Sequence, residues 1–186
     1  MIKALVPLAK GFEEIEAVTI IDVLRRGGIE VLVGSLHHDG LIEGAHKITL
    51  QSDIEVASVN ADDIDIVVLP GGWGGTRALA DDVNVQKLLQ EMNSKHKQIA
   101  AICAAPYALY KAGVLKPNFT CYPSIEEEIA LKGYQGDKAQ VVEEGNIMTS
   151  RGPATAICFA LRIVKKFQGD ETYESVKAGL LASYCD

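Results

Sequence analysis

The sequence predicts one α/β domain, and three observations support this fold class. Residues 2–8 form an apolar run, residues 13–26 follow with a helical pattern, and residues 29–36 form a second apolar run. Two strands joined by so short a helical crossover lie parallel in one sheet. A further apolar run at 99–102 also changes to a helical pattern, at Cys103. With 186 residues, 48% of them hydrophobic, the chain can bury a sizeable core as a single domain over its whole length.

The remaining elements follow from periodicity and turn residues. Asp39-Gly40 and Glu43-Gly44 predict small antiparallel excursions outside the main sheet within residues 37–49. Gly27-Gly28 ends the first helix, and Pro153 suits the start of a later one, where its missing N–H is not needed. The other expected elements are a strand at 64–69, a helix at 83–95, a short strand at 120–122, a helix from Pro123-Ser124 through Leu131, a hairpin at 140–149, and helices at 154–167 and 170–182.

Composition argues against several classes of partner. The net charge is -7, from 18 basic and 25 acidic side chains, and no basic cluster stands out along the chain. A general nucleic-acid binder or a binder of anionic membranes is therefore not expected. The N-terminal apolar run is too short for a signal peptide, and no run reaches membrane-spanning length. We expect a cytoplasmic protein.

The four cysteines, Cys103, Cys121, Cys158 and Cys185, are scattered without C-x-x-C spacing. This pattern indicates neither a disulfide framework nor a zinc site, and it fits a reducing compartment. Cys158 belongs to the apolar stripe of its helix, where core packing is expected. Cys121 falls near the carboxyl edge of the sheet, and Cys185 is expected to be mobile at the chain end.

Cys103 stands at the predicted turn from a strand into a helix. Such an elbow holds its side chain at the carboxyl edge of a parallel sheet, beside the free N–H groups of the new helix. Ala101 and Ala105, two residues to either side, hold the places that glycine holds in the hydrolase nucleophile elbow. The helix N-terminus favours the thiolate, which is the nucleophilic form of cysteine. The alternative, from these residues alone, is a buried structural cysteine in an apolar strand.

Glu16 is the first candidate partner of this cysteine. At about 100° per residue it projects between Ile20 and Val23, on a helix that is apolar around much of its circumference. Burial raises the pKa of a carboxyl group, so a protonated Glu16 can donate a hydrogen bond to a thiolate without adding negative charge. The alternative is a glutamate at the helix edge that reaches water. Glu13 and Glu14 are more simply explained by their place in the first turn, which favours acidic side chains.

A glycine-rich loop, Gly71-Gly72 followed by Gly74-Gly75, comes after one strand and before a helix. Main-chain N–H groups in such a loop can gather into a pocket for an anion or oxyanion. No dinucleotide or P-loop pattern fits these residues, so a phosphate site is only weakly indicated. The alternative is that the glycines simply allow a tight turn.

No base adjoins Cys103 in the sequence, although papain-like and amidotransferase-like chemistry needs an oriented histidine. The four histidines, His37, His38, His46 and His96, are irregularly spaced, and we interpret them as solvated surface residues. Their spacing gives little support to a metal site, and none is expected.

Four stretches together resemble the ThiJ/PfpI superfamily, in matching order and over essentially the whole chain. The nearest resemblance is to the Parkinsonism-associated protein deglycase branch and its bacterial ThiJ-like relatives. The stretches are Ala9-Lys10-Gly11-Phe12-Glu13-Glu14-Ile15-Glu16, Val67-Val68-Leu69-Pro70-Gly71-Gly72, Ala100-Ala101-Ile102-Cys103-Ala104-Ala105-Pro106 and Thr149-Ser150-Arg151-Gly152-Pro153-Ala154-Thr155.

This resemblance implies a flavodoxin-like three-layer sandwich with a mainly parallel sheet, of the class I glutamine amidotransferase type, that forms a homodimer. It implies that Cys103 is a reactive, easily oxidised nucleophile, and that Glu16 hydrogen-bonds to it. The expected oxyanion and substrate-binding positions are Gly71, Gly72, Ala104 and Tyr122. The implied activities need no cofactor: conversion of 2-oxoaldehydes such as methylglyoxal to lactate, deglycation of early glyoxal adducts, and protection against oxidative stress.

Two positions depart from patterns seen within the superfamily. Tyr122, followed by Pro123, stands where some members place a histidine, and tyrosine is a poor base at neutral pH. Proton transfer would then fall to Glu16 or water. Ala104 stands where the protease-like branch has histidine, so peptidase activity is not expected.

Three functions remain open on the sequence. The first is a cysteine enzyme in which Cys103 attacks the aldehyde carbon of a small aldehyde or glycated substrate. The second is a redox sensor or holdase chaperone in which oxidation of Cys103 is the signal and no turnover occurs. The third is a dimeric scaffold with a vestigial site, which the tyrosine at position 122 would suit.

Overall fold

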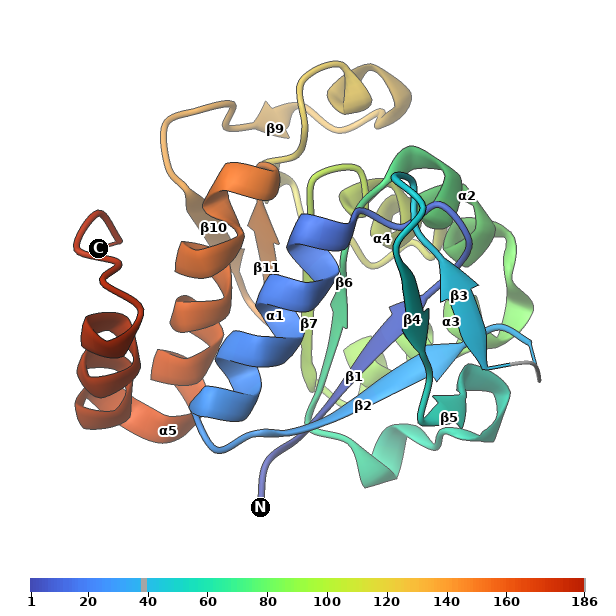
Figure 1. Cartoon of the computed structure of the whole chain (residues 1–186). Helices are drawn as coiled ribbons and strands as arrows, with labels where there is room; N and C mark the ends of the chain where they lie inside the picture. Colours follow the sequence, from blue (N-terminus) through green and yellow to red (C-terminus); the bar gives the residue numbers. More distant parts are fainter. Residues whose placement is uncertain (38–39, 186) are drawn as a thin grey trace.

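The computed structural model describes residues 1–37 and 40–185. Within these residues, seven strands form a central sheet in the order β10-β11-β7-β6-β1-β2-β5 (Figure 1). Every neighbouring pair is parallel except β10 and β11, which form the hairpin expected at 140–149. The strands of this sheet are β1 (Lys3–Leu8), β2 (Glu30–Ser35), β5 (Ile54–Glu55), β6 (Ile66–Leu69), β7 (Gln98–Ile102), β10 (Val141–Glu144) and β11 (Ile147–Ser150).

Helices cover both faces of the sheet and enclose two apolar cores. One core lies between the sheet and the pair α1 and α5, and the other lies between the sheet and α2, α3 and α4 (Figure 1). The predicted three-layer α/β sandwich with a mainly parallel sheet is therefore confirmed. The helices are α1 (Glu14–Arg26), α2 (Trp73–Asp81), α3 (Val83–Ser94), α4 (Pro106–Lys111) and α5 (Ala156–Gly179).

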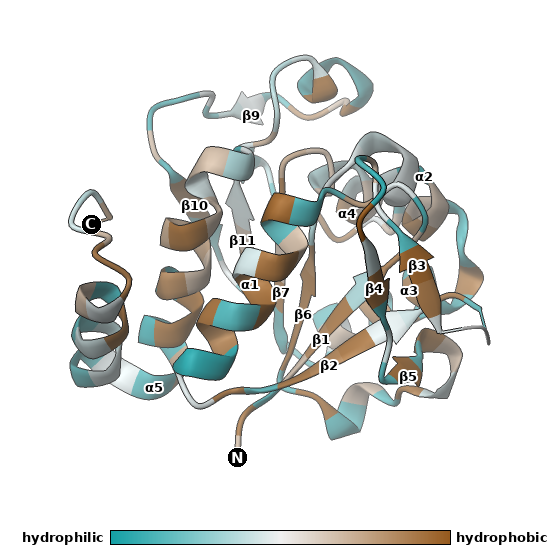
Figure 2. Cartoon of the chain, in the orientation of Figure 1, coloured by the Kyte–Doolittle hydropathy of each residue, from teal (hydrophilic) through white to brown (hydrophobic). Residues whose placement is uncertain are grey.

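Helix α1 forms because its apolar residues recur on the face that meets the sheet. Apolar and polar residues accordingly alternate along the helix (Figure 2). Ala17, Ile20 and Val23 are fully buried on this face. The helix ends at Gly27, whose N–H donates to the carbonyl of Val23. A Cβ at Gly27 would lie 2.6 Å from a methyl carbon of Val164, so glycine allows α1 to pack closely against α5.

The antiparallel excursion is confirmed as a hairpin outside the main sheet, formed by β3 (Leu41–Glu43) and β4 (Thr49–Gln51). Gly44 lies in its turn and donates its N–H to the carbonyl of Ile48. The surface placement of His38 and the Asp39 half of the predicted Asp39-Gly40 turn lie outside the described residues. No helix in the described part of the chain has the length and apolar character needed to cross a bilayer.

The segment between α4 and β10 differs from the expectation. The predicted strand at 120–122 is wrong, because the chain pairs earlier: β8 (Asn118–Phe119) lies parallel to β9 (Gly133–Tyr134). The predicted helix through Leu131 is also wrong and is reduced to one 3₁₀ turn, Ile125–Glu128. Ser124 adopts a left-handed φ of 82° and its side chain caps nothing, so the helix has no N-cap to begin from.

Helix α2 was not expected, because two glycines in its first turn lower helix propensity. Close packing requires one of them: a Cβ at Gly75 would lie 2.9 Å from the Cα of Phe12. Helix α5 begins after a 3₁₀ turn, Pro153–Thr155, and is interrupted at Gly169, whose backbone is not helical (φ 83°). Its two halves confirm the two predicted helices at 154–167 and 170–182.

The expectation that the chain has no disulfide is wrong, because Cys158 and Cys185 are bonded to each other. Cys158 is buried in the core as expected, but Cys185 is also buried and is not a mobile end. The kink in α5 returns the chain end to the start of the same helix, and this long-range path leaves no spacing signature in the sequence.

Candidate active site

Cys103 follows β7 directly, at the carboxyl edge of the sheet. Its backbone is left-handed (φ 63°), a strained conformation for a residue with a side chain, and α4 begins three residues later. Its N–H donates a 3.0 Å hydrogen bond to the carbonyl of Ser150, at the end of the neighbouring strand β11. The backbone therefore has the strand-to-helix elbow that the sequence predicted, and the side chain is 8% exposed.

Glu16 is fully buried at the N-terminal end of α1. Its Oε2 accepts a 2.7 Å hydrogen bond from the N–H of Gly71, while Oε1 is buried without a hydrogen-bond partner among the described residues. Burial raises the pKa of Glu16 from 4.5 to about 7, despite opposing contributions from Gly71 and Cys103. The alternative of a solvated glutamate at the helix edge is therefore wrong, and the carboxyl group is poised to gain or lose a proton near neutrality.

The thiol of Cys103 interacts with this carboxyl group and with two main-chain amides. Burial raises the pKa of Cys103, and the negative charge and hydrogen bond of Glu16 raise it further. The N–H groups of Gly72 and Ala104 act in the opposite direction but do not outweigh those effects. These effects oppose the thiolate that the helix N-terminus was expected to favour, so the state of the sulfur depends on the proton of Glu16.

Gly71 and Gly72 follow β6 and pass directly beside the cysteine. A Cβ at Gly71 would lie 2.6 Å from the Cβ of Cys103 and 2.8 Å from Oε2 of Glu16, so only glycine fits. Gly72 has a left-handed φ of 86° and precedes α2. The two amides have different partners: Gly71 donates to Glu16, whereas Gly72 faces the sulfur together with Ala104.

Tyr122 borders the cysteine on another side. Its main-chain N–H donates a 2.8 Å hydrogen bond to the carbonyl of Cys103, and its side chain is 49% exposed. Its ring lies over Gly152, where an added Cβ would come within 3.2 Å of a ring carbon. Tyr122, Pro123 and Pro153 help to line a cavity of about 260 Å³ beside this position.

Glu14, in the first turn of α1, makes contacts that the sequence did not indicate. It is buried, and Oε1 accepts hydrogen bonds from the main-chain N–H of His46 at 2.5 Å and of Ile48 at 3.5 Å. Its Oε2 lies 2.9 Å from Nδ1 of His46. Glu14 therefore fastens the β3–β4 turn to the start of α1, a role that goes beyond matching the helix dipole.

Among the described residues, Glu13, Glu14 and His46 also place one potential metal-ligand atom each within 4.8 Å of one another. Both Glu14 oxygens already accept hydrogen bonds from protein groups. His46 is exposed, as are His37 and His96, which agrees with the expected surface placement.

Cys121 is the other described cysteine outside the disulfide. It is fully buried, and burial raises its pKa to about 12, with a further contribution from the charge of Glu126. Burial raises the pKa of both thiols, but only Cys103 has a buried carboxyl group beside it, so Cys121 offers a matched internal reference for Cys103.

Comparison with known proteins agrees with this geometry. The sequence model of the DJ-1/PfpI family matches residues 2–166. The chain is 42% identical to Drosophila melanogaster protein dj-1beta over 182 residues, 97% of each chain, and the crystal structure of Drosophila melanogaster DJ-1beta matches it with a TM-score of 0.92 over 97% of both chains. It is 32% identical over 164 residues to the Caenorhabditis elegans glutathione-independent glyoxalase DJR-1.2, covering 88% of this chain and 87% of that protein. The expected flavodoxin-like fold is thereby confirmed, and the chain belongs to the DJ-1/PfpI family.

Proposed function

We propose that the protein is a cofactor-independent glyoxalase that acts through Cys103 and Glu16 on 2-oxoaldehydes or their early glycation adducts. The observation that carries the proposal is the burial of Glu16 beside the elbow cysteine, which raises its pKa to about 7. A carboxyl group with this pKa can both accept and return a proton at physiological pH. A relative of similar length, from Caenorhabditis elegans, is named as a glutathione-independent glyoxalase.

In the first proposed step, the sulfur of Cys103 bonds to the aldehyde carbon, and the thiol proton passes to the Glu16 carboxylate. The carbonyl electron pair moves onto oxygen, which takes up a proton to give a hemithioacetal. The amides of Gly72 and Ala104 lie beside the sulfur and can stabilise the negative oxygen as it forms. The amide of Gly71 holds Glu16 in position and acts only through it.

In the second proposed step, the hydrogen on the former aldehyde carbon leaves as a proton and the neighbouring carbonyl is reduced. Glu16 or water moves that proton, and the product is a thioester of a 2-hydroxy acid. Water then attacks the thioester, which releases the 2-hydroxycarboxylate and restores the Cys103 thiol. The net reaction adds one water molecule to the aldehyde and needs no external oxidant or cofactor.

Tyr122 is proposed to bind substrate and not to act as a base. A phenol hydroxyl can donate or accept a hydrogen bond but is a poor general base at neutral pH. The half-exposed ring and the neighbouring prolines give the cavity an apolar wall for the carbon substituent of the substrate.

The test is lactate formation from methylglyoxal by the wild type, Cys103→Ser and Glu16→Gln. We expect turnover in the wild type and in the control Cys121→Ser, and its loss in Cys103→Ser and Glu16→Gln. Equal rates in all four proteins would overturn the mechanism. A separate assay distinguishes deglycation from glyoxalase activity. It measures how fast a methylglyoxal–amine adduct releases its amine with the enzyme present, and compares this with the spontaneous release at the same concentration of free aldehyde. Faster release with the enzyme indicates deglycation.

The alternative function is a redox-sensing holdase chaperone in which oxidation of Cys103 is the signal. The amides of Gly72 and Ala104 and a protonated Glu16 supply three hydrogen-bond donors around the sulfur, which would suit a sulfinate. Intact-protein mass spectrometry after graded peroxide treatment tests this. A gain of two oxygens on Cys103 before any change at Cys121 supports it, and earlier oxidation of Cys121 contradicts it.

We also propose a homodimer in the cytoplasm. Ile15 and Val18 are exposed on α1, and Ile48, close to the start of α1, is exposed before β4. Adjacent exposed apolar side chains of this kind favour a second protein surface. Light scattering should give twice the chain mass of 20.0 kDa, and Val18→Glu should give the monomer. Cell fractionation tests the location.

A further inference from the structure

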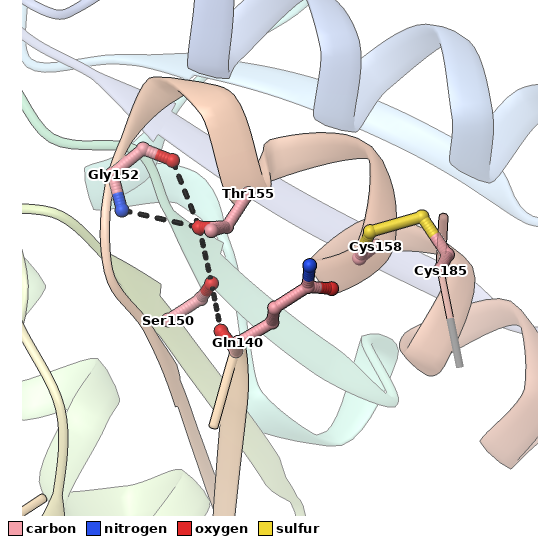
Figure 3. The surroundings of a disulfide bond; sticks show 6 residues. All are labelled: Gln140, Ser150, Gly152, Thr155, Cys158 and Cys185. Carbon is pink, nitrogen blue, oxygen red and sulfur yellow. Dashed lines mark hydrogen bonds between the residues drawn. A yellow bond between two sulfur atoms is a disulfide. The ribbon is translucent and has the colours of Figure 1, made fainter. Parts of the chain in front are cut away.

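The C-terminal segment, residues 170–185, is joined to the rest of the chain at both ends. At Gly169 the backbone leaves helical geometry (φ 83°), and the second half of α5 turns back beside the first half (Figure 1). At its far end, Cys185 is bonded to Cys158 in the first turn of α5, 27 residues earlier (Figure 3). The bond therefore closes a loop that contains the kink.

Apart from the disulfide, the contacts that hold this segment are few. Tyr173, Val176 and Ala182 are buried in the core shared by α1 and α5. Lys165 forms a 2.8 Å ion pair with Asp170 across the kink, and its ammonium group lies 5.0 Å from the Tyr173 ring centroid. A segment held by so few groups opens locally at low free-energy cost.

Both sulfur atoms belong to buried residues, with Cys158 6% and Cys185 1% exposed. A reductant in solution therefore reaches the bond only when the chain end opens. Cys185 follows α5 and belongs to no strand of the sheet, so this opening requires only local unfolding and leaves the sheet intact.

We propose that Cys158 and Cys185 form a second redox site, a reversible dithiol/disulfide couple that fastens the C-terminal segment when oxidised and releases it when reduced. In the oxidising direction the two thiols lose two protons and two electrons, and one hydrogen peroxide molecule becomes two water molecules. In the reducing direction an external dithiol attacks one sulfur by thiol–disulfide exchange and itself becomes a disulfide. This site is separate from Cys103, and the proposal does not depend on turnover there.

A hydroxyl network limits how far the release extends (Figure 3). The hydroxyl of Thr155 accepts the N–H of Gly152 at 3.1 Å and lies 2.8 Å from the hydroxyl of Ser150, which donates to the carbonyl of Gln140 at 2.6 Å. These bonds hold the start of α5 without help from the disulfide. We therefore expect the first half of α5 and the Cys103 elbow to keep their structure in the reduced protein.

Release exposes the apolar side chains of Tyr173, Val176 and Ala182. New apolar surface thus forms under reducing conditions. A chaperone activated by oxidation of Cys103 would instead become active under oxidising conditions. Binding of an apolar dye at low and high dithiol concentrations distinguishes these two kinds of regulation.

Alkylation and hydrogen exchange test the proposal on the full chain. Iodoacetamide under denaturing conditions should add two groups to the oxidised protein and four after native treatment with dithiothreitol. Amides of 170–185 should exchange at least tenfold faster after reduction, while those of 156–168 stay unchanged. Cys185→Ser should match the reduced wild type with or without dithiothreitol, and Cys121→Ser should respond like the wild type. Three outcomes would overturn the proposal. They are four labelled cysteines after peroxide treatment, equal hydrogen exchange in the oxidised and reduced proteins, and reduction of the disulfide only when the whole protein unfolds.

Discussion

The main-chain N–H of Gly71 donates a 2.7 Å hydrogen bond to Oε2 of Glu16, although 55 residues separate the two in the chain. This bond joins the loop after β6 to the first turn of α1 and fixes which carboxyl oxygen remains free. The free oxygen, Oε1, is buried without a partner among the described residues, and Cys103 interacts with the same carboxyl group. A proton on Glu16 would therefore remove a buried charge and provide a donor toward the sulfur.

Glu16→Gln should stabilise the protein at alkaline pH. Because the folded state raises the pKa of Glu16 from 4.5 to about 7, it binds a proton that the unfolded chain has already lost between these values. Rising pH over this window therefore favours unfolding, by about 3 kcal/mol once both states are ionised. Glutamine keeps an acceptor for Gly71 and carries no charge.

Urea unfolding at pH 5 and at pH 8 measures this difference. The wild type should lose stability relative to Glu16→Gln as the pH rises, and the two should converge at the acidic end. Parallel pH profiles would show that Glu16 is ionised throughout and that its pKa is ordinary in the fold. Glu13→Gln serves as the charge-matched control.

The same substitution should separate the reactivity of Cys103 from turnover. The charge of Glu16 is one of the causes that raise the pKa of Cys103, so its removal lowers that pKa and increases the thiolate fraction at pH 8. A fall of one in pKa gives about tenfold faster alkylation while the thiol remains mostly protonated. Lactate formation should nevertheless be lost, because the proton acceptor is gone.

Iodoacetamide labelling of Cys103 across pH 6–10, followed by peptide mass spectrometry, checks this prediction, with Cys121 as the internal reference. Slower labelling of Cys103 in Glu16→Gln would mean that Glu16 supports the thiolate in the free protein. In that case the thiolate would be stabilised, as expected from the sequence, and burial would not raise the pKa of Cys103.

Local patterns predicted the elbow and the burial of Glu16 because each depends on neighbouring residues. Small residues around Cys103 allow strand and helix to approach, and helical phase places Glu16 among apolar side chains. The hydrogen-bond partner of each glycine amide depends on how the loop after β6 meets α1 and the Cys103 elbow, which are distant in the sequence. The division of the two glycine amides, with Gly71 on Glu16 and Gly72 on the sulfur, therefore could not be predicted.

The unpredicted features have the same physical origin. Helix α2 contains glycines that disfavour a helix locally, but the chain before α1 lies so close that Gly75 cannot be larger. The Cys158–Cys185 pairing depends on a reversal at Gly169, which a helical pattern on either side does not reveal. In each case tertiary contact overrides the local preference.

Gly71→Ala should abolish turnover while leaving the fold recognisable. The new Cβ would lie 2.6 Å from the Cβ of Cys103 and 3.0 Å from the N–H nitrogen of Ala104, and both are held by backbone. Relief of the clash must displace the elbow, so we expect at least a ~100-fold loss of kcat/KM and a stability loss of about 1–3 kcal/mol.

A matched control is Gly179→Ala, where an added Cβ meets nothing within 4 Å at the end of α5. It should be neutral or stabilise the protein by up to about 1 kcal/mol, since alanine is the better helix former. Lactate assays and thermal unfolding of both variants decide the matter, and full activity in Gly71→Ala would mean that the loop can move away from Cys103 at no cost.

Glu14→Gln should loosen the β3–β4 turn and lower the pKa of His46. Burial alone would raise the pKa of Glu14, but the hydrogen bonds from the ring and main chain of His46 and from Ile48 lower it. In return, Glu14, with a contribution from Glu13, raises the pKa of His46 above its ordinary 6.5. The stabilising effect of protonated His46 is therefore complete below pH 6.5 and is lost as the pH rises through the higher value in the fold.

Proton NMR titration of the four histidines, with His46 assigned from its loss in His46→Gln, measures this shift directly. The midpoint of His46 should lie above 6.5 in the wild type and return toward 6.5 in Glu14→Gln. Hydrogen exchange at residues 44–48 should quicken in Glu14→Gln, because Oε1 accepts from the amides of His46 and Ile48 and an uncharged acceptor holds them less strongly. An unshifted His46 in the wild type would show that the ring is free in solution and that only the main-chain bonds fasten the turn.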